Sequence, residues 1–225
     1  MPQNELNNNK VASGRVDGLL AALFYRKISR IITSKLVSTP LTPNQVTLMS
    51  IILGLLSSAL IAAGNYPLEI LGVIVLQISL LLDVVDGDLA RAKDMKSAWG
   101  HNLDILSDRF TDSVLIIAVS IACYKHLQDG TVLLWGSCAL AGYQYFHYLT
   151  DVWLFPPVHS HSGQRGINII KVMGTEGALV ANEALITVFT IAVIFRQIKP
   201  ALILCTIVSL IMSIMQIIRI RKMSV

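Results

Sequence analysis

The chain has 225 residues, of which 54% are hydrophobic and only 14% are charged, with a formal net charge of +4. Soluble domains carry about 25% charged residues, so this composition excludes an ordinary soluble domain. The apolar residues form long runs, and a segment in lipid must pair its own backbone groups. The expected fold class is therefore an all-α integral membrane protein with one membrane domain.

The N-terminal region, residues 1–36, is expected to precede the first span. Residues 1–16 are polar and predict a flexible cytoplasmic tail without a signal peptide, because a basic segment before the first apolar run is missing. Residues 17–36 mix apolar and basic side chains, which favours an amphipathic juxtamembrane helix with its cations at anionic headgroups. A short basic linker is the alternative. The membrane domain is expected to cover residues 17–225.

Apolar runs of roughly 20 residues, the length that a bilayer demands, predict six transmembrane helices. Thr42 can cap the first of them, with Pro43 at its first position and Gln45 completing a capping box. Residues 64–67 form a turn, and Ser97 can cap the third helix. The predicted spans are about 43–63, 68–92, 98–124, 131–148, 177–195 and 200–218.

The Lys and Arg residues predict the orientation, because cytoplasmic segments are enriched in them. With a cytoplasmic N-terminus, 14 of the 18 Lys and Arg residues lie on the inner side. Three lie in outer turns, namely Lys125, Arg196 and Lys199, and Arg109 lies within a span. We therefore expect a multi-pass cell membrane protein with both termini in the cytoplasm. The segment between the second and third spans then opens to the same side.

Cysteine and histidine do not indicate a site of their own. Cys123, Cys138 and Cys205 lie in apolar runs without CxxC spacing and are expected to pack in the core. His159 and His161 have no carboxylate or cysteine close in sequence, and a pair of loop histidines is the better interpretation. Nothing in the sequence indicates nucleic-acid binding.

Acidic residues concentrate in one segment. Seven of the chain's 14 acidic residues lie between Asp83 and Asp112. Ionisable side chains within a membrane are costly and usually functional. The candidate site is therefore expected in this segment.

The end of the second span presents one acidic helical face. At 100° per residue, Asp83, Asp86, Gly87 and Ala90 share this face, whereas Asp88 points away from it and outward. The small residues on the same face let a neighbouring helix or a ligand approach the backbone.

The third span carries a matching stripe. Gly100, Asp104 and Asp108 follow one another at i, i+4 spacing, and Asp112 continues the row. Because the two helices are antiparallel, two carboxylates from each can meet. At 1.5 Å per residue, they would meet about 10 Å below the cytoplasmic surface.

Four carboxylates at this depth repel one another, and a divalent cation would offset that repulsion. An all-oxygen set favours Mg²⁺ or Mn²⁺, and such an ion suggests phosphate chemistry. Structural ion pairs with Arg91 and Arg109 are one alternative. A cation transporter or an intramembrane polyprenyl transferase that uses the same aspartates is another.

The two acidic helices resemble the signature of the CDP-alcohol phosphotransferase family, which fixes eight residues over 26 positions. Here they are Asp83, Asp86, Gly87, Ala90, Arg91, Gly100, Asp104 and Asp108. The resemblance implies an enzyme that moves a substituted phosphoryl group from a CDP-alcohol, such as CDP-diacylglycerol, to an acceptor hydroxyl. It would release CMP in phospholipid or polar-lipid biosynthesis.

The resemblance also implies roles for the signature residues. Asp83, Asp86, Asp104 and Asp108 would hold one or two Mg²⁺ or Mn²⁺ ions, and Asp108 would be the general base. The CDP contacts would be Asp83, Gly87, Ala90, Arg91 and Gly100. Family members like this one are commonly homodimers.

Beyond the signature, the segment around Arg109 and Asp112 resembles the family members that use inositol phosphate. Arg109 would bind such an acceptor, and the pocket would be completed by Arg165, Lys171, Arg219 or Arg221. The alternative is that the residues from Arg165 to Arg221 only follow the enrichment of basic residues in cytoplasmic segments. The late fourth span carries His147 and no Lys or Arg, unlike many polyol-phosphate users. The acceptor therefore stays open.

Overall fold

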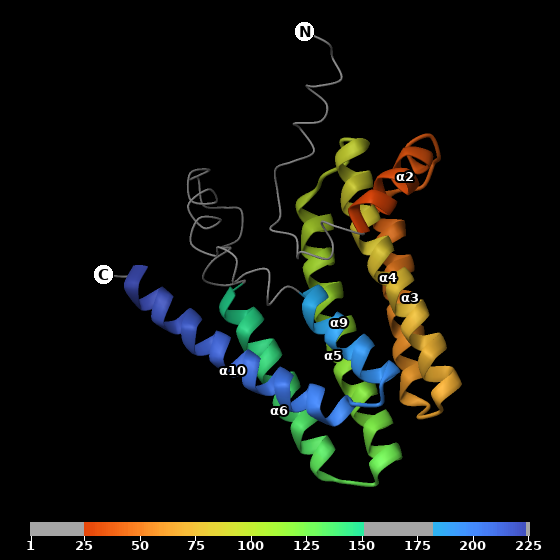
Figure 1. Ribbon diagram of the computed structural model, residues 1–225. Helices are drawn as coiled ribbons and strands as arrows, with labels where there is room; N and C mark the ends of the chain where they lie inside the picture. Colours follow the sequence, from red (N-terminus) through yellow and green to blue (C-terminus); the bar gives the residue numbers. More distant parts are fainter. Residues whose placement is uncertain (1–24, 151–181, 224–225) are drawn as a thin grey trace.

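The computed structural model describes residues 25–150 and 182–223, which form seven helices and no strand (Figure 1). The helices are α2 (Arg26–Leu36), α3 (Pro43–Ala62), α4 (Tyr66–Ala92), α5 (Ala98–Leu127), α6 (Thr131–Leu149), α9 (Asn182–Ile194) and α10 (Ile198–Met223). The predicted tail, the start of the predicted juxtamembrane helix and residues 177–181 of the predicted fifth span lie outside the described residues.

The long helices pack in two groups. α3 lies against both α4 and α5, α6 runs along α10, and α5 contacts α6 (Figure 1). α2 crosses the end of α4, and α9 contacts α4, α5 and α10. Their buried apolar side chains form one main core, which includes Ile116, Phe189 and Leu202.

Two predicted helix starts are confirmed by their caps. Thr42 accepts a hydrogen bond from the backbone N–H of Gln45 at 3.4 Å, and Gln45 Oε1 accepts one from the Thr42 N–H at 2.9 Å. Ser97 accepts from the N–H of Gly100 at 2.9 Å. These bonds satisfy helix N–H groups that otherwise lack a partner.

Helix ends differ from the prediction by a few residues. α4 begins at Tyr66, inside the predicted turn of residues 64–67 and two residues before the predicted start of the span. α5 continues to Leu127, after which Gln128 adopts the left-handed conformation with φ 52°. α10 runs from Ile198 through the basic segment to Met223, beyond the predicted residue 218. Hydropathy alone ends a span where charges begin, but Lys and Arg are good helix formers and the helix continues.

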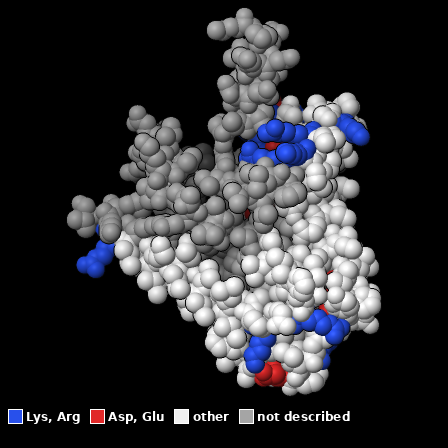
Figure 2. Space-filling view, viewed as in Figure 1, with Lys and Arg blue, Asp and Glu red and all other residues white. Residues whose placement is uncertain are grey.

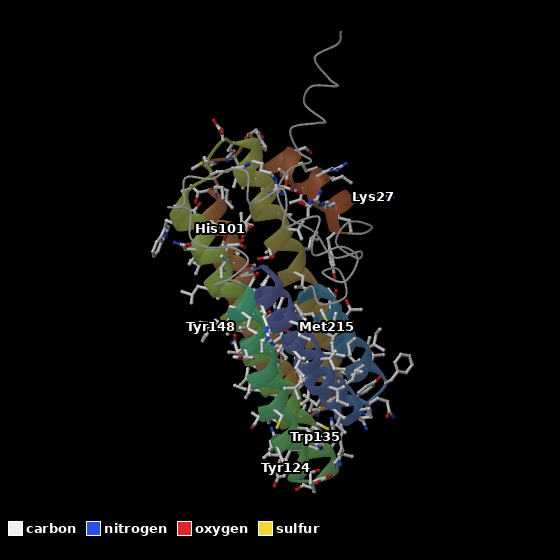
Figure 3. All side chains as sticks on the ribbon, turned by 90° about the vertical axis from the view of Figure 1, so that its left-hand side faces the viewer. Lys27, His101, Tyr124, Trp135, Tyr148 and Met215 are labelled. Carbon is white, nitrogen blue, oxygen red and sulfur yellow. The ribbon has the colours of Figure 1, made fainter. Side chains whose placement is uncertain are left out.

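Among the helices that the structure describes, three are long and apolar enough to cross a membrane, namely residues 43–62, 66–92 and 198–218. Figure 2 shows Lys and Arg over α2, at the C-terminal end of α10 and at the opposite end of the molecule, whereas the described surface between the two ends is mostly uncharged on the visible face. Lys27 and His101 lie toward one end of the helices, whereas Tyr124 and Trp135 lie at the other (Figure 3). This distribution is typical of a membrane protein.

Polar contacts connect the helices at the end of the molecule where the turn between α5 and α6 lies. Lys199 Nζ lies 2.6 Å from Asp129 Oδ2, and this hydrogen bond lowers the pKa of Asp129 to about 2. Lys125 Nζ donates to the carbonyl oxygen of Ala62 at 2.8 Å. His126 Nε2 lies 2.5 Å from Oε1 of the fully buried Glu69.

Small residues bring helices close. A Cβ added to Gly142 on α6 would lie 2.3 Å from Oγ and 3.3 Å from Cβ of Ser209 on α10. The two helices therefore approach at a distance that only glycine permits, a known feature of helix packing in membranes.

Candidate active site

Three carboxylates converge between α4 and α5. Asp83 lies on α4, Asp104 and Asp108 lie one turn apart on α5, and one oxygen of each falls within 4.8 Å of the others. All three side chains are half-buried. The two helices are antiparallel and joined by residues 93–97, which places both acidic faces at the same end of the molecule.

This donor set fits a hard divalent cation. Three carboxylate oxygens that meet so closely repel one another unless a positive charge lies between them. Oxygen-only ligands favour Mg²⁺ or Mn²⁺ over zinc, which prefers nitrogen and sulfur. Asp83, Asp104 and Asp108 are therefore the residues that can hold such an ion.

Asp86, the fourth predicted ligand, is not part of this group of three. Its side chain is buried, and Oδ2 accepts a hydrogen bond from Thr47 Oγ1 on α3 at 2.5 Å. The same hydroxyl also lies 3.2 Å from the carbonyl oxygen of Pro43, so its single proton is shared between the two acceptors. α3 thus fixes the direction of the Asp86 carboxylate beside the group.

Asp88 occupies a different position from the expected one. It points away from the three carboxylates, as predicted, but it is buried rather than outward. Oδ2 accepts from Ser29 Oγ on α2 at 2.6 Å, and Oδ1 accepts from Arg91 Nη2. The sequence could not show this contact, because α2 covers the side of α4 that would otherwise face the surroundings.

The predicted nucleotide residues line the same end of α4 and α5. The guanidinium of Arg91 lies over Gly87, where an added Cβ would be 3.5 Å from Nη1. An added Cβ on Gly100 would lie 3.3 Å from Oδ1 of Asn44, at the start of α3. Ala90 is half-buried, and its carbonyl oxygen accepts from the Met95 N–H at 3.0 Å.

A second polar network lies deeper, between α5 and α6. Tyr143 donates a hydrogen bond to the buried carboxylate of Asp112, and Arg109 Nη1 donates to the Tyr143 hydroxyl at 3.3 Å. Gln144 donates to the carbonyl oxygen of Arg109 at 3.3 Å. Asp112 follows Asp108 at i, i+4 spacing and also belongs to this network, and burial makes its hydrogen bonds important.

Among the predicted acceptor residues, the structure describes the side chains of Arg109 and Arg221. Arg109 is half-buried, one residue after Asp108, and hydrogen-bonded to α6 through Tyr143. Arg165 and Lys171 lie outside the described residues. Arg219 lies in α10, and its side chain lies outside the described part.

Sequence reasoning missed several polar partners of the site. Ser29, Thr47 and Tyr143 each hold a charged or signature residue by a hydrogen bond. The only signal in the sequence is that each interrupts an apolar helical face. That signal does not reveal which partner such a residue meets.

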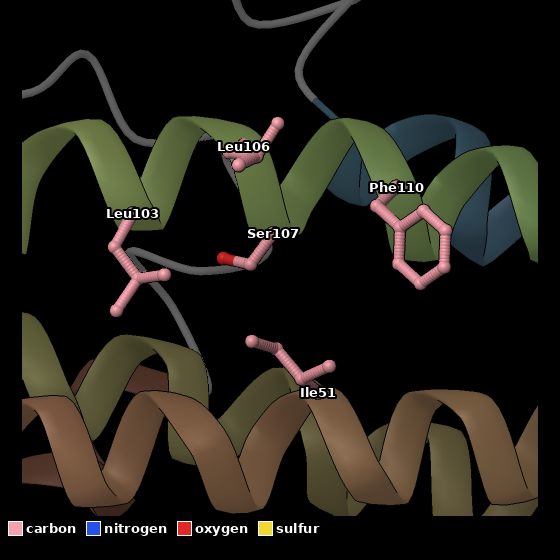
Figure 4. Close-up of a pocket in the computed structure, with 5 residues that line it drawn as sticks. All are labelled: Ile51, Leu103, Leu106, Ser107 and Phe110. Atoms are coloured by element: carbon pink, nitrogen blue, oxygen red, sulfur yellow. The ribbon is translucent and has the colours of Figure 1, made fainter.

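A small apolar hollow lies between α3 and α5, on the face of α5 next to the carboxylates. Leu103, Ser107 and Phe110 point from α5 toward Ile51 of α3, and Leu106 completes its lining (Figure 4). Its volume is about 260 Å³. Leu103 and Ser107 each precede an aspartate of the group, so the acidic and apolar surfaces are adjacent.

Comparison with known sequences connects this site to one family. The sequence model described as CDP-alcohol phosphatidyltransferase matches residues 40–155. A bifunctional IPC transferase and DIPP synthase of Aquifex aeolicus is 35% identical over 136 residues, 60% of this chain and 30% of the relative. An archaetidylinositol phosphate synthase of Pyrococcus horikoshii is 35% identical over 86 residues, 38% of this chain and 44% of the relative. The matches thus span less than half the length of both relatives.

Comparison with solved structures identifies the fold. A crystal structure of Mycobacterium tuberculosis phosphatidylinositol phosphate synthase with manganese and citrate has a TM-score of 0.64 at 18% identity. The match covers 85% of this chain and 88% of the chain in that structure. The same enzyme with CDP-DAG bound has a TM-score of 0.61, covering 86% of this chain and 94% of that chain. The helical arrangement is therefore shared with these structures.

Proposed function

The chain belongs to the CDP-alcohol phosphatidyltransferase family, and on this premise we propose that it transfers a substituted phosphoryl group from a CDP-lipid to an acceptor hydroxyl. CMP is the other product. The observation that carries the proposal is the meeting of Asp83, Asp104 and Asp108 within 4.8 Å, inside the segment that matches the family.

One or two divalent cations, Mg²⁺ or Mn²⁺, are the proposed cofactors. Asp83, Asp104 and Asp108 would hold them, and Asp86 would join them as a fourth ligand. When bound, such an ion neutralises charge on the phosphates of the donor. The all-oxygen chemistry of these carboxylates and their placement on two packed helices support this assignment.

Asp108 is the proposed general base. It would take the proton from the acceptor hydroxyl, whose oxygen then forms a bond to the phosphorus that carries the lipid alcohol. The bond between this phosphorus and the oxygen bridging to CMP breaks, and CMP leaves with the electron pair. A base must lie within hydrogen-bond reach of the hydroxyl that it activates. The half-buried position of Asp108 beside the other carboxylates supports this role.

The nucleotide is proposed to bind at the ends of α4 and α5. Arg91 would contact the diphosphate, and Asp83, Gly87, Ala90 and Gly100 would surround the nucleotide. Glycine backbones allow close approach of a ligand, which supports these positions.

The proposed donor is CDP-diacylglycerol or a similar CDP-lipid, and the proposed acceptor is inositol phosphate. The fold shared with a structure that holds CDP-DAG and the name of the archaeal relative support this pair. Arg109 would bind the acceptor phosphate, together with Arg165, Lys171 and Arg219.

The proposed architecture has six transmembrane helices, behind an amphipathic juxtamembrane helix that includes α2. The membrane domain would cover residues 17–225 after a flexible tail of residues 1–16. Both termini and the active site would face the cytoplasm, and the protein would be a homodimer. The basic side chains over α2 and the apolar lengths of the helices support this arrangement.

A substrate panel tests the proposal. Purified protein in vesicles would receive CDP-diacylglycerol, CDP-archaeol or CDP-inositol, with inositol phosphate, glycerol phosphate or serine, in Mg²⁺ or Mn²⁺. We expect CMP from a CDP-lipid together with inositol phosphate, and mass spectrometry of the lipid product identifies the pair. Failure of every combination, together with Mn²⁺ uptake into the vesicles, would favour a cation transporter instead.

A further inference from the structure

A chain of two hydrogen bonds connects α2 to the arginine of the signature. Ser29 on α2 is fully buried, and its Oγ donates to Asp88 Oδ2 at 2.6 Å. The other oxygen of Asp88 accepts from Arg91 Nη2. Asp88 thus uses one oxygen for each neighbour, and α2 holds the carboxylate that holds the arginine.

Arg91 is held on one side and partly accessible on the other. Its side chain is 31% exposed, and its guanidinium lies over Gly87. Within the described residues, the buried Nε of Arg91 has no hydrogen-bond partner. A buried donor without a partner is costly, whereas the exposed part of the guanidinium is the part that a ligand oxygen can reach.

We propose that Ser29 and Asp88 are positioning residues that fix Arg91 for the diphosphate of the donor. This inference rests on the proposed function, in which Arg91 contacts that diphosphate. A free arginine side chain loses rotamer freedom when it is fixed. An arginine that a carboxylate already holds loses less rotamer freedom when a ligand binds, and this strengthens the complex.

The attachment of α2 does not depend on Ser29. Ile32 and Leu36 of α2 pack against a small apolar cluster that includes Val85 and Leu89 of α4. The Tyr25 hydroxyl, just before α2, also donates to Gln77 of α4. Removing the Ser29 hydroxyl should therefore leave α2 in place and change only the support of Asp88.

The negative charge of Asp88 allows an experiment to distinguish a positioning role from a purely electrostatic one. If Asp88 only added negative charge near a diphosphate, its removal would strengthen nucleotide binding. If it positions Arg91, the removal weakens binding. The two effects have opposite signs, so the direction of the change distinguishes them.

The test compares Ser29→Ala, Asp88→Asn and their double variant with wild type in two measurements. The first is calorimetric binding of CDP in Mg²⁺, and the second is the KM for CDP-diacylglycerol. Loss of a hydrogen bond to a charged group predicts a CDP affinity about tenfold weaker for Asp88→Asn and about threefold weaker for Ser29→Ala. The donor KM should rise in parallel while kcat is retained.

Two further results separate positioning from general stability. The double variant should be no weaker than Asp88→Asn alone, because Ser29 acts through Asp88. Tyr25→Phe removes another contact between the α2 region and α4, and it should leave CDP binding and KM unchanged.

Four results would overturn the positioning role of Ser29 and Asp88, the proposed function, or both. Unchanged or tighter CDP binding in Asp88→Asn, or a loss of affinity in Tyr25→Phe equal to that in Ser29→Ala, would overturn the inference. A wild-type protein that binds CDP but releases no CMP contradicts the proposed function, while the CDP affinities still judge the positioning role. A wild-type protein that binds no CDP overturns both.

Discussion

Carboxylate oxygens of Asp83 on α4 and Asp108 on α5 lie within 4.8 Å of each other, although 25 positions separate the two residues. The antiparallel packing of two helices brings them together, and Asp104 completes the group. Such an arrangement needs a positive charge to be favourable.

Asp83→Ala and Asp104→Ala should each weaken Mn²⁺ binding at least about tenfold, because each removes one of few carboxylate ligands. Electron paramagnetic resonance of free Mn²⁺ measures the affinity directly. Asp94→Asn is the matched control, since Asp94 lies in the link between the helices at φ 55° and asparagine tolerates this conformation. Equal Mn²⁺ affinity in all three variants would argue against a metal at this group.

Thr47→Val removes the donor to Asp86 while it keeps the shape of the side chain. We expect catalytic activity about tenfold lower, since partners that orient ligand carboxylates typically contribute this much. Ser58→Ala on the same helix is the control, because the Ser58 hydroxyl donates only to the Gly54 carbonyl oxygen at 2.9 Å. A Thr47→Val enzyme as active as Ser58→Ala would show that Asp86 needs no orientation.

Tyr143→Phe should lower the free energy of unfolding by about 1–3 kcal/mol, because the buried carboxylate of Asp112 loses a hydrogen-bond donor. Thermal unfolding in detergent measures the change. Tyr145→Phe, on the same helix with a side chain that is 49% exposed, should have little effect. Similar unfolding temperatures for both variants would mean that the network adds no stability.

Gly142→Ala should destabilise the pairing of α6 and α10 by about 1–3 kcal/mol, since the added Cβ meets Ser209. Gly130→Ala is the control, because an added Cβ there has no atom within 4 Å among the described residues. Unfolding in detergent should separate the two variants. A Gly142→Ala protein as stable as Gly130→Ala would show that the helices can move apart at no cost.

Local sequence patterns predicted the helices and much of the site. The capping box at Thr42 and Gln45 is confirmed, because the N-terminus of a helix depends on residues within one turn. The convergence of Asp83, Asp104 and Asp108 also followed from helical spacing and a short link. These features depend on neighbours in sequence.

Contacts between distant segments could not be predicted in the same way. Asp88 was expected to face outward, yet Ser29, 59 positions earlier, covers it. Asp112 follows Asp108 at the expected spacing on α5, but its hydrogen-bond partner is Tyr143 of α6, which the sequence did not predict. Both depend on which helix packs beside which face, and periodicity within one helix carries no information on that choice.

The central claim is that the cluster of Asp83, Asp104 and Asp108 is a transferase centre, with Asp108 as its general base. The most direct measurement is CMP release by wild type and Asp108→Asn, in vesicles with a CDP-lipid, inositol phosphate and Mn²⁺. Asparagine keeps the shape but cannot accept the proton. A positioned base contributes about 10²–10⁴-fold, so we predict a loss of at least 10²-fold at an unchanged unfolding temperature. CMP release by Asp108→Asn at the wild-type rate would contradict the account.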